Sequence, residues 1–169
     1  WSNPKSEEQI LLTSLFVVAT PIGNLSDVSA RAINVLKEVH TVASEDTRVT
    51  RKLLSHYGIK KPLISLNAHN GDRQIPKLLR ILEEHDLAFT TDAGTPGVSD
   101  PGHKLVQAAQ HSSTRIIPIP GASSITSALS VAPFPIDSFY FAGFVPRRTK
   151  DIVKLIEKLG DLNVPIVFF

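Results

Sequence analysis

Short apolar runs alternate with segments in which apolar residues recur every three or four positions. The runs predict buried β-strands at 15–19, 41–44, 63–66, 87–91 and 116–119. The helical spacing between them predicts helices at about 28–39, 47–56, 75–82 and 103–110. Ser26 or Asp27 is expected to cap the first helix. Because the crossovers are long enough for parallel pairing, the pattern predicts an α/β fold with a parallel sheet flanked by helices.

The pattern changes beyond a short helix that Ser123 or Ser124 can cap and that runs to about residue 130. Prolines become frequent there, a new strand is predicted at 139–141, and a helix at 152–159 precedes an apolar strand at 165–169. We therefore expect a tail at 1–14, an N-terminal α/β domain at 15–122 and the beginning of a second α/β domain at 123–169. Because the sequence starts with Trp1 and stops inside a predicted strand, we expect a C-terminally truncated part of a longer protein.

The composition is that of an ordinary globular protein, with 42% hydrophobic and 20% charged residues. The net charge of +2 is compatible with an RNA partner. The absence of cysteine excludes disulfides and thiolate metal sites, and the scattered histidines predict no metal site. With no signal peptide and no apolar run near the ~20 residues of a membrane span, a cytoplasmic location is expected.

Three glycine-containing loops follow predicted strands. They are Pro21-Ile22-Gly23, Ala93-Gly94-Thr95-Pro96 and Pro120-Gly121-Ala122-Ser123-Ser124. In a parallel sheet these loops share one edge, where they can converge on one small molecule; the alternative is that they are simple tight turns. None is a dinucleotide-binding or Walker motif, so NAD or ATP lacks its usual sequence support.

Two polar segments follow other strands at the same predicted edge. Glu45-Asp46-Thr47-Arg48 is a plausible substrate-facing set, and it also suits a helix N-cap at Asp46 or Thr47. His69-Asn70 offers an imidazole that can serve as a general base, or is merely a polar loop tip. Both interpretations stay open for each segment.

Basic residues form several clusters. The clusters are Arg48-Arg51-Lys52, Lys60-Lys61, Arg73-Lys77-Arg80 and Arg147-Arg148-Thr149-Lys150. Such clusters suit phosphate backbones, although most charged runs are solvated surfaces. No aromatic-interleaved RNA-binding motif of a known type accompanies them.

Six motifs occur in a fixed order along the chain: VVATPIGNL at 17–25, EDTR at 45–48, HN at 69–70, DAGTP at 92–96 with SDPG at 99–102, PGAS at 120–123, and GFVPRR at 143–148. Together they resemble the ribosomal RNA small subunit methyltransferase I family, within the tetrapyrrole methylase superfamily. The match covers about residues 15–169, and the long DAGTP…SDPG run with EDTR upstream is its most specific part.

This resemblance implies S-adenosylmethionine as methyl donor and 2′-O-methylation of a cytidine in the decoding region of 16S rRNA. It implies two α/β domains with the cofactor between them, usually in a homodimer that acts on 16S rRNA or the small ribosomal subunit. By motif position, the residues that would line the cofactor are Pro21, Ile22, Gly23, Gly94, Thr95, Val98, Gly121, Ser123 and Ser124. Those that would face the RNA are Glu45, Asp46, Arg48, His69 and Asn70, and the basic Arg147 and Arg148 are added to them.

A ribose hydroxyl is weakly acidic, so a base should help it lose its proton. The hypothesis is that His69 or Glu45 is that base and that Arg48 holds a phosphate. Two alternatives stay open: another methylase of the superfamily, acting on a tetrapyrrole or a protein side chain, and a non-catalytic fragment that binds a ligand or RNA.

Overall fold

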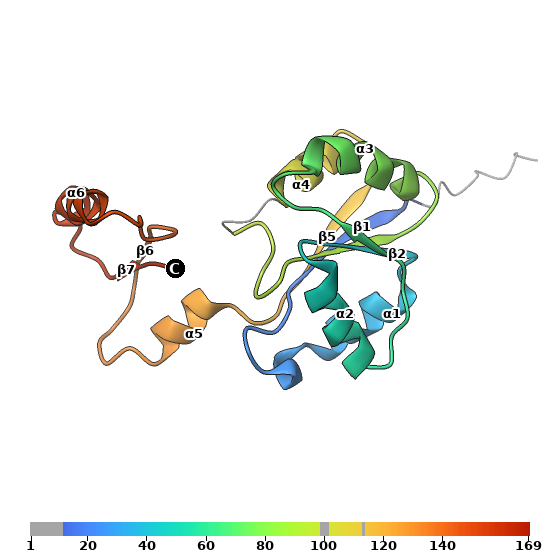
Figure 1. Cartoon of the computed structure of the whole chain (residues 1–169). Helices are drawn as coiled ribbons and strands as arrows, with labels where there is room; N and C mark the ends of the chain where they lie inside the picture. Colours follow the sequence, from blue (N-terminus) through green and yellow to red (C-terminus); the bar gives the residue numbers. More distant parts are fainter. Residues whose placement is uncertain (1–11, 99–101, 113) are drawn as a thin grey trace, which may run out of the picture. The chain divides into compact units, whose positions relative to one another are not determined.

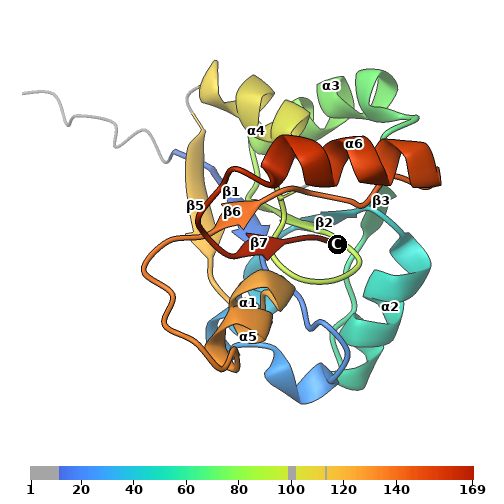
Figure 2. The ribbon, with the colours of Figure 1, turned by 90° about the vertical axis from the view of Figure 1, so that its left-hand side faces the viewer.

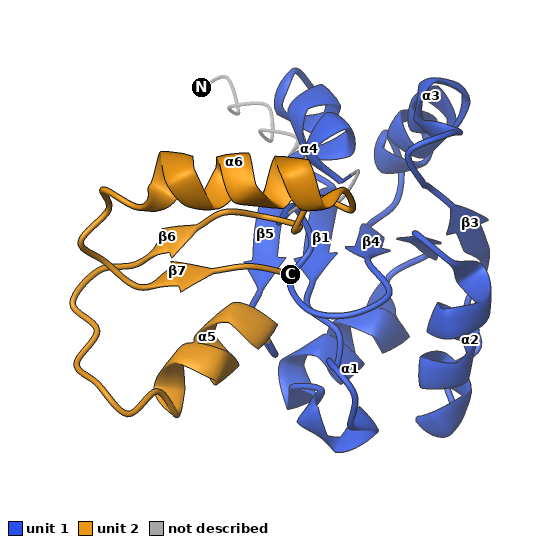
Figure 3. Ribbon diagram, turned by 60° about the vertical axis from the view of Figure 1, so that its left-hand side comes forward, with its two compact units in different colours: residues 1–122 blue, residues 123–169 orange. Residues whose placement is uncertain are grey.

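The computed structural model describes residues 12–98, 102–112 and 114–169. Most of the expected tail and the Ser99-Asp100-Pro101 part of the SDPG motif lie outside the described residues. The chain divides into two compact units, Trp1–Ala122 and Ser123–Phe169, shown in separate colours in Figure 3.

The first unit is built on a five-stranded sheet in the order β3-β2-β4-β1-β5. The strands are β1 (Ser14–Val18), β2 (Thr41–Ser44), β3 (Leu63–Ser65), β4 (Leu87–Thr90) and β5 (Arg115–Ile119). Every neighbouring pair is parallel. The predicted α/β fold with a parallel sheet is confirmed.

Helices cover both faces of this sheet, as Figures 1 and 2 show: α1 and α2 lie on one face, α3 and α4 on the other. Their bounds are α1 (Ala30–Glu38), α2 (Thr47–His56), α3 (Gly71–Leu82) and α4 (His103–Gln110). The strands read as nearly continuous apolar runs because both of their faces are buried. Along β4, Ala88 faces the α1–α2 core, whereas Leu87 and Phe89 face the α3–α4 core.

The predicted cap of the first helix is wrong. A short 3₁₀ helix, η1 (Leu25–Asp27), comes between β1 and α1 and contains both candidate residues. Asn24 caps η1 by accepting a hydrogen bond from the Ser26 amide. The Ser29 hydroxyl instead caps α1, accepting from the amide of Ala32 at 3.1 Å. The apolar spacing could not separate these turns, since several cap-forming residues lie close together here.

The second unit is small and contains α5 (Ser124–Ser130), β6 (Tyr140–Phe141), α6 (Thr149–Leu159) and β7 (Ile166–Val167). Strands β6 and β7 are parallel, and α5 and α6 lie on either side of the pair (Figure 3). The pairing continues past β7, because the Phe169 amide donates to the Gly143 carbonyl at 2.8 Å. Only Leu159 is buried in this unit, whose residues are all described. Across the described chain, no helix has both the length and the apolar character needed to span a membrane.

Candidate functional site at the carboxyl edge of the sheet

The candidate site lies where the five parallel strands of the first unit end. Since all the strands run in one direction, the loops that follow them share one edge of the sheet. The loops that begin at Pro21, Ala93 and Pro120 and the two polar segments are therefore brought to this edge, as the alternation of strands and helices predicts.

The three glycine loops touch one another directly. Thr20 and Gly94 exchange two backbone hydrogen bonds, of 2.9 and 3.0 Å, which join the first loop to the second. The Thr95 hydroxyl donates to the Ala122 carbonyl at 3.3 Å, which joins the second loop to the third. The loops thus form one connected rim.

At two positions of this rim the structure explains why the residue is glycine. Gly94 has φ +82°, a left-handed conformation that side chains disfavour. Gly121 approaches β1 so closely that a Cβ there would lie 3.0 Å from the Cβ of Ala19. Gly94 therefore suits the backbone conformation of its loop, and Gly121 suits the close approach of its loop to the end of β1.

A pocket of about 400 Å³ opens between the first loop, the start of α2 and the end of β4. It is lined by Thr20, Pro21, Ile22, Gly23, Leu25, Val49, Thr50, Lys52, Leu53, Thr91, Asp92 and Ala93. The Thr91 side chain is buried, and its hydroxyl makes no hydrogen bond to another described residue. A mostly apolar cavity that also offers a buried hydroxyl is typical of a small-molecule site.

The polar segments join this rim through a row of hydrogen bonds. The Asp92 carboxylate accepts from the Asp46 amide at 3.0 Å, linking the loops after β4 and β2. The Ser65 hydroxyl donates to the Glu45 carbonyl at 3.4 Å, and the Asn70 amide group donates to the Ser65 carbonyl at 3.1 Å. The edge from β3 to β4 is therefore held by side chains as well as by the sheet.

Asp46 and Arg48 form a two-point ion pair at the start of α2. Arg48 Nη2 and Nε lie 2.6 and 3.0 Å from the two carboxylate oxygens. The Asp46 carboxylate also accepts from the Arg48 amide at 2.8 Å, which confirms Asp46 as the N-cap of α2. The Arg48 guanidinium, followed by that amide, lowers the pKa of Asp46 to about 2, and Asp46 in turn raises the pKa of Arg48. The Arg48 side chain stays 83% exposed, so it can still meet a ligand.

The other predicted substrate residues have different surroundings. His69 is exposed at the loop tip, where its backbone amide donates to the Asn67 side chain at 3.0 Å. The Asn70 amide group is used within its own loop, because its Oδ1 also accepts from the Asn67 amide at 2.8 Å. Glu45 is half-buried beside the Ser65 hydroxyl.

Four predicted site residues belong to the second unit. Ser123 is the N-cap of α5, and Ser124 is its first residue. Arg147 and Arg148 are exposed just before α6, with Arg148 as its N-cap.

Sequence reasoning missed several pocket residues. Thr91, Leu25 and Val49 line the pocket but were not predicted there. Thr91 ends the strand predicted at 87–91 and directly precedes the DAGTP motif, which is a usable signal. Val49 lies on a helix whose apolar stripe indicated only burial.

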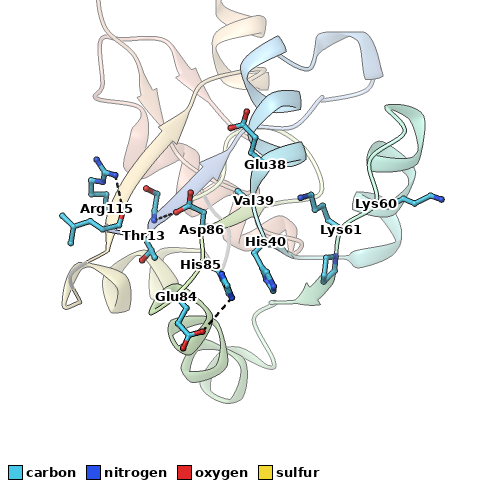
Figure 4. A pocket seen from close by; sticks show the side chains of 13 residues that line it. Thr13, Glu38, Val39, His40, Lys60, Lys61, Glu84, His85, Asp86 and Arg115 are labelled. Atoms are coloured by element: carbon cyan, nitrogen blue, oxygen red, sulfur yellow. Dashed lines mark hydrogen bonds and ion pairs between the residues drawn. The ribbon is translucent and has the colours of Figure 1, made fainter. Parts of the chain in front are cut away.

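A larger depression of about 800 Å³ lies at the opposite, amino edge of the sheet (Figure 4). His40 and His85 stack at its centre with ring centroids 4.2 Å apart. None of the glycine loops lies there, and the described residues contain no group of His, Asp or Glu arranged to hold a metal ion. The smaller carboxyl-edge pocket is therefore the better candidate site.

Comparison with known proteins identifies the family of the chain. The family model described as tetrapyrrole (corrin/porphyrin) methylases matches residues 14–169. A protein named ribosomal RNA small subunit methyltransferase I from Xylella fastidiosa is 47% identical, over 80% of this chain and 50% of its own length. A protein of the same name from Borrelia garinii subsp. bavariensis is 48% identical, over 89% of this chain and 69% of its own length.

The fold also matches a solved structure. The crystal structure of diphthine synthase superposes with a TM-score of 0.72 at 15% identity, covering 93% of this chain and 64% of that one. The chain spans about half the length of several of the curated relatives that it matches. On the family model and on the relatives that it covers most fully, the chain belongs to the tetrapyrrole methylase family, in its ribosomal RNA small subunit methyltransferase I branch.

Proposed function

We propose that the chain is the methyl-donor-binding portion of an S-adenosylmethionine-dependent methyltransferase that modifies the 2′-oxygen of a cytidine in the decoding region of 16S rRNA. The observation that carries the proposal is the rim of three joined glycine loops beside a pocket, with Arg48 exposed at the same edge. The proposal extends to a cytoplasmic homodimer that acts on 16S rRNA or the small ribosomal subunit.

The rim has the chemistry that the cofactor requires. Ile22 and Val98 are apolar side chains that are 37% and 39% exposed, so an adenine ring can cover them. The pocket beside them is mostly apolar, and Thr91, Asp92 and Lys52 supply polar groups to its lining. The residues that would hold the cofactor are Pro21, Ile22, Gly23, Gly94, Thr95, Val98 and Gly121, together with Ser123 and Ser124 of the second unit. When bound, the cofactor supplies an electrophilic methyl group on a sulfonium.

The polar side of the edge then has three tasks. A carboxylate or an imidazole can accept the ribose proton, and Glu45 and His69 are the two candidates. Arg48 would hold a phosphate of the RNA, because a guanidinium binds phosphate oxygens in a fork. Asp46 would orient Arg48, since it already holds two nitrogens of that guanidinium. Holding the hydroxyl in line with the methyl group supplies much of the rate.

Two measurements test this proposal. Calorimetric titration of the chain with S-adenosylmethionine should show binding, and the Gly94→Ala variant should bind more weakly. Transfer of labelled methyl groups should go to 16S rRNA or the small subunit, and not to a tetrapyrrole or a protein. No binding and no transfer to RNA by the 169-residue chain or by a full-length relative would contradict the proposal.

The identity of the base is tested by paired variants. We expect His69→Ala or Glu45→Gln, whichever removes the base, to lower kcat about 100-fold or more with little change in cofactor affinity. If neither variant lowers the rate, neither Glu45 nor His69 is a general base, and positioning of the hydroxyl accounts for the reaction.

A further inference from the structure

The solvent face of α2 carries Arg48, Arg51 and Lys52 and no carboxylate. From Thr47 to Gly71 the sequence contains five of the 18 Lys and Arg residues and none of the 16 Asp and Glu residues. The rest of the chain therefore carries an excess of carboxylates, although the net charge of the whole is only +2. The excess positive charge of this chain is therefore concentrated between Thr47 and Gly71.

The packing of α2 fixes the direction in which these charges point. Thr50, Leu53 and Leu54 are buried against the sheet. Arg51 and Lys52 lie on the opposite side and are exposed. The helix cannot rotate to hide its cations without exposing its apolar side to water.

The charged surface continues beyond the helix. Lys60 and Lys61 follow in the connection to β3, and with Arg51 they line a groove of about 330 Å³. We call Arg51, Lys52, Lys60 and Lys61 the α2 cationic face. Among the described residues, none of the four forms an ion pair with a carboxylate. Arg48, by contrast, is already paired with Asp46.

The two ends of this face show where a ligand would run. At one end Lys52 lines the pocket at the carboxyl edge of the sheet, beside the candidate site. At the other end Lys60 and Lys61 border the depression in Figure 4, where Glu38, Glu84 and Asp86 introduce negative charge. The positive surface thus begins at the candidate site and ends at the amino edge of the sheet.

We propose that the α2 cationic face binds the sugar-phosphate backbone of RNA next to the reacting nucleotide. The inference rests on the proposed function, because it takes the substrate to be RNA. With ten residues, α2 is about 15 Å long, which is enough to lie along a few consecutive phosphates of one strand. Between the cations Ser55, His56 and Gly58 are exposed, and the His56 ring packs edge-on against Tyr57, so the two rings do not form a row on which successive bases can stack. The contacts would position the RNA without reading its sequence.

A matched pair of double variants tests this inference. Arg51→Ala/Lys60→Ala removes two cations from the α2 cationic face, and neither residue lines the pocket of the candidate site. Lys77→Ala/Arg80→Ala removes the same two residue types from exposed positions of α3, on the other face of the same sheet. Both variants have the same net charge and leave the buried residues of both helices unchanged.

Binding of each protein to a 16S rRNA transcript and to an unrelated RNA is measured as a function of salt. We expect the α2 variant to bind both RNAs about tenfold more weakly, with a slope of log K against log salt that is smaller by about 1.4. The α3 variant should resemble the unmodified chain, and both variants should keep the thermal midpoint and cofactor affinity of the unmodified chain.

The outcomes separate the inference from the proposed function. If the chain binds RNA but the two variants weaken binding equally, only net charge matters and the inference fails. It also fails if the α2 variant alters binding to vesicles of phosphatidylserine and phosphatidylcholine as much as binding to RNA. If RNA binding depends on α2 but methyl groups are never transferred to RNA, the proposed function fails, and what stands of the inference is that the α2 cationic face binds an RNA backbone.

Discussion

The two units of this chain differ most in what they bury. In the first unit, α1 and α2 close one core against the sheet, and α3 and α4 close a second. In the second unit Leu159 is the one buried apolar side chain, while Phe144, Ile156 and Val131 are 66%, 58% and 81% exposed. A two-stranded sheet with two helices is too small to bury its apolar side chains by itself. The first unit therefore has its own source of stability, and the second does not.

The largest expected effect comes from separating the units. A peptide of residues 1–122 should unfold cooperatively in urea, because both faces of its sheet are covered. A peptide of residues 123–169 should show little helix by far-UV circular dichroism. A cooperative transition in the second peptide would contradict the conclusion that the second unit has no source of stability of its own.

Single substitutions of apolar residues compare the stability of the two units within the intact chain. Phe89→Ala removes a fully buried ring from the first unit and should lower the free energy of unfolding by about 3 to 5 kcal/mol. Ile156→Ala in α6 should change it by about 0.5 kcal/mol or less, since that side chain is 58% exposed. Urea midpoints for both variants measure the difference, and equal losses would show that α6 packs more tightly than its exposure indicates.

The same contrast explains how much of the fold the sequence predicts. The bounds of β2, α2 and α4 were predicted to the residue, because apolar spacing and burial agree there. In the second unit burial is slight, and apolar spacing gave only a late start for α6, which begins at Thr149. The clearest miss in the first unit is η1, where neighbouring cap-forming residues compete over a few positions.

The candidate site is predictable only in part for a related reason. Strand ends place the glycine loops and polar segments at one edge, and this follows from the order of elements. The hydrogen bond from the Asp46 amide to Asp92 joins positions 46 residues apart, so no local pattern indicates it. The burial of the Thr91 hydroxyl likewise depends on segments far apart in the sequence, since the Thr20 hydroxyl donates to the Thr91 carbonyl.

A smaller effect is expected from substituting two glycines of the first unit, one in the glycine rim and one outside it. Gly94→Ala and Gly58→Ala both place a side chain on a left-handed backbone, at φ +82° and +66°, and each should cost about 1 kcal/mol of stability. Gly58 follows α2, away from the glycine rim, so only Gly94→Ala should weaken binding of S-adenosylmethionine. Calorimetry on both variants checks this. Equal loss of affinity in the two variants would show that the cofactor binds elsewhere, or that its affinity depends only on the stability of the fold.

The smallest expected effect lies at the cap of α2 and depends on pH. Arg48 lowers the pKa of Asp46 from 3.8 to about 2 in the folded protein. A carboxylate whose pKa is lowered by folding stabilises the fold above its unfolded pKa, and this contribution is lost as the pH falls through the folded value. Asp46→Asn keeps a cap-forming side chain but removes the charge. The unmodified chain should therefore be more stable than the variant at about pH 5, and the difference should close towards about pH 2. Urea midpoints of both proteins across this range measure the effect, and a difference that does not depend on pH would show that the ion pair adds nothing beyond the cap.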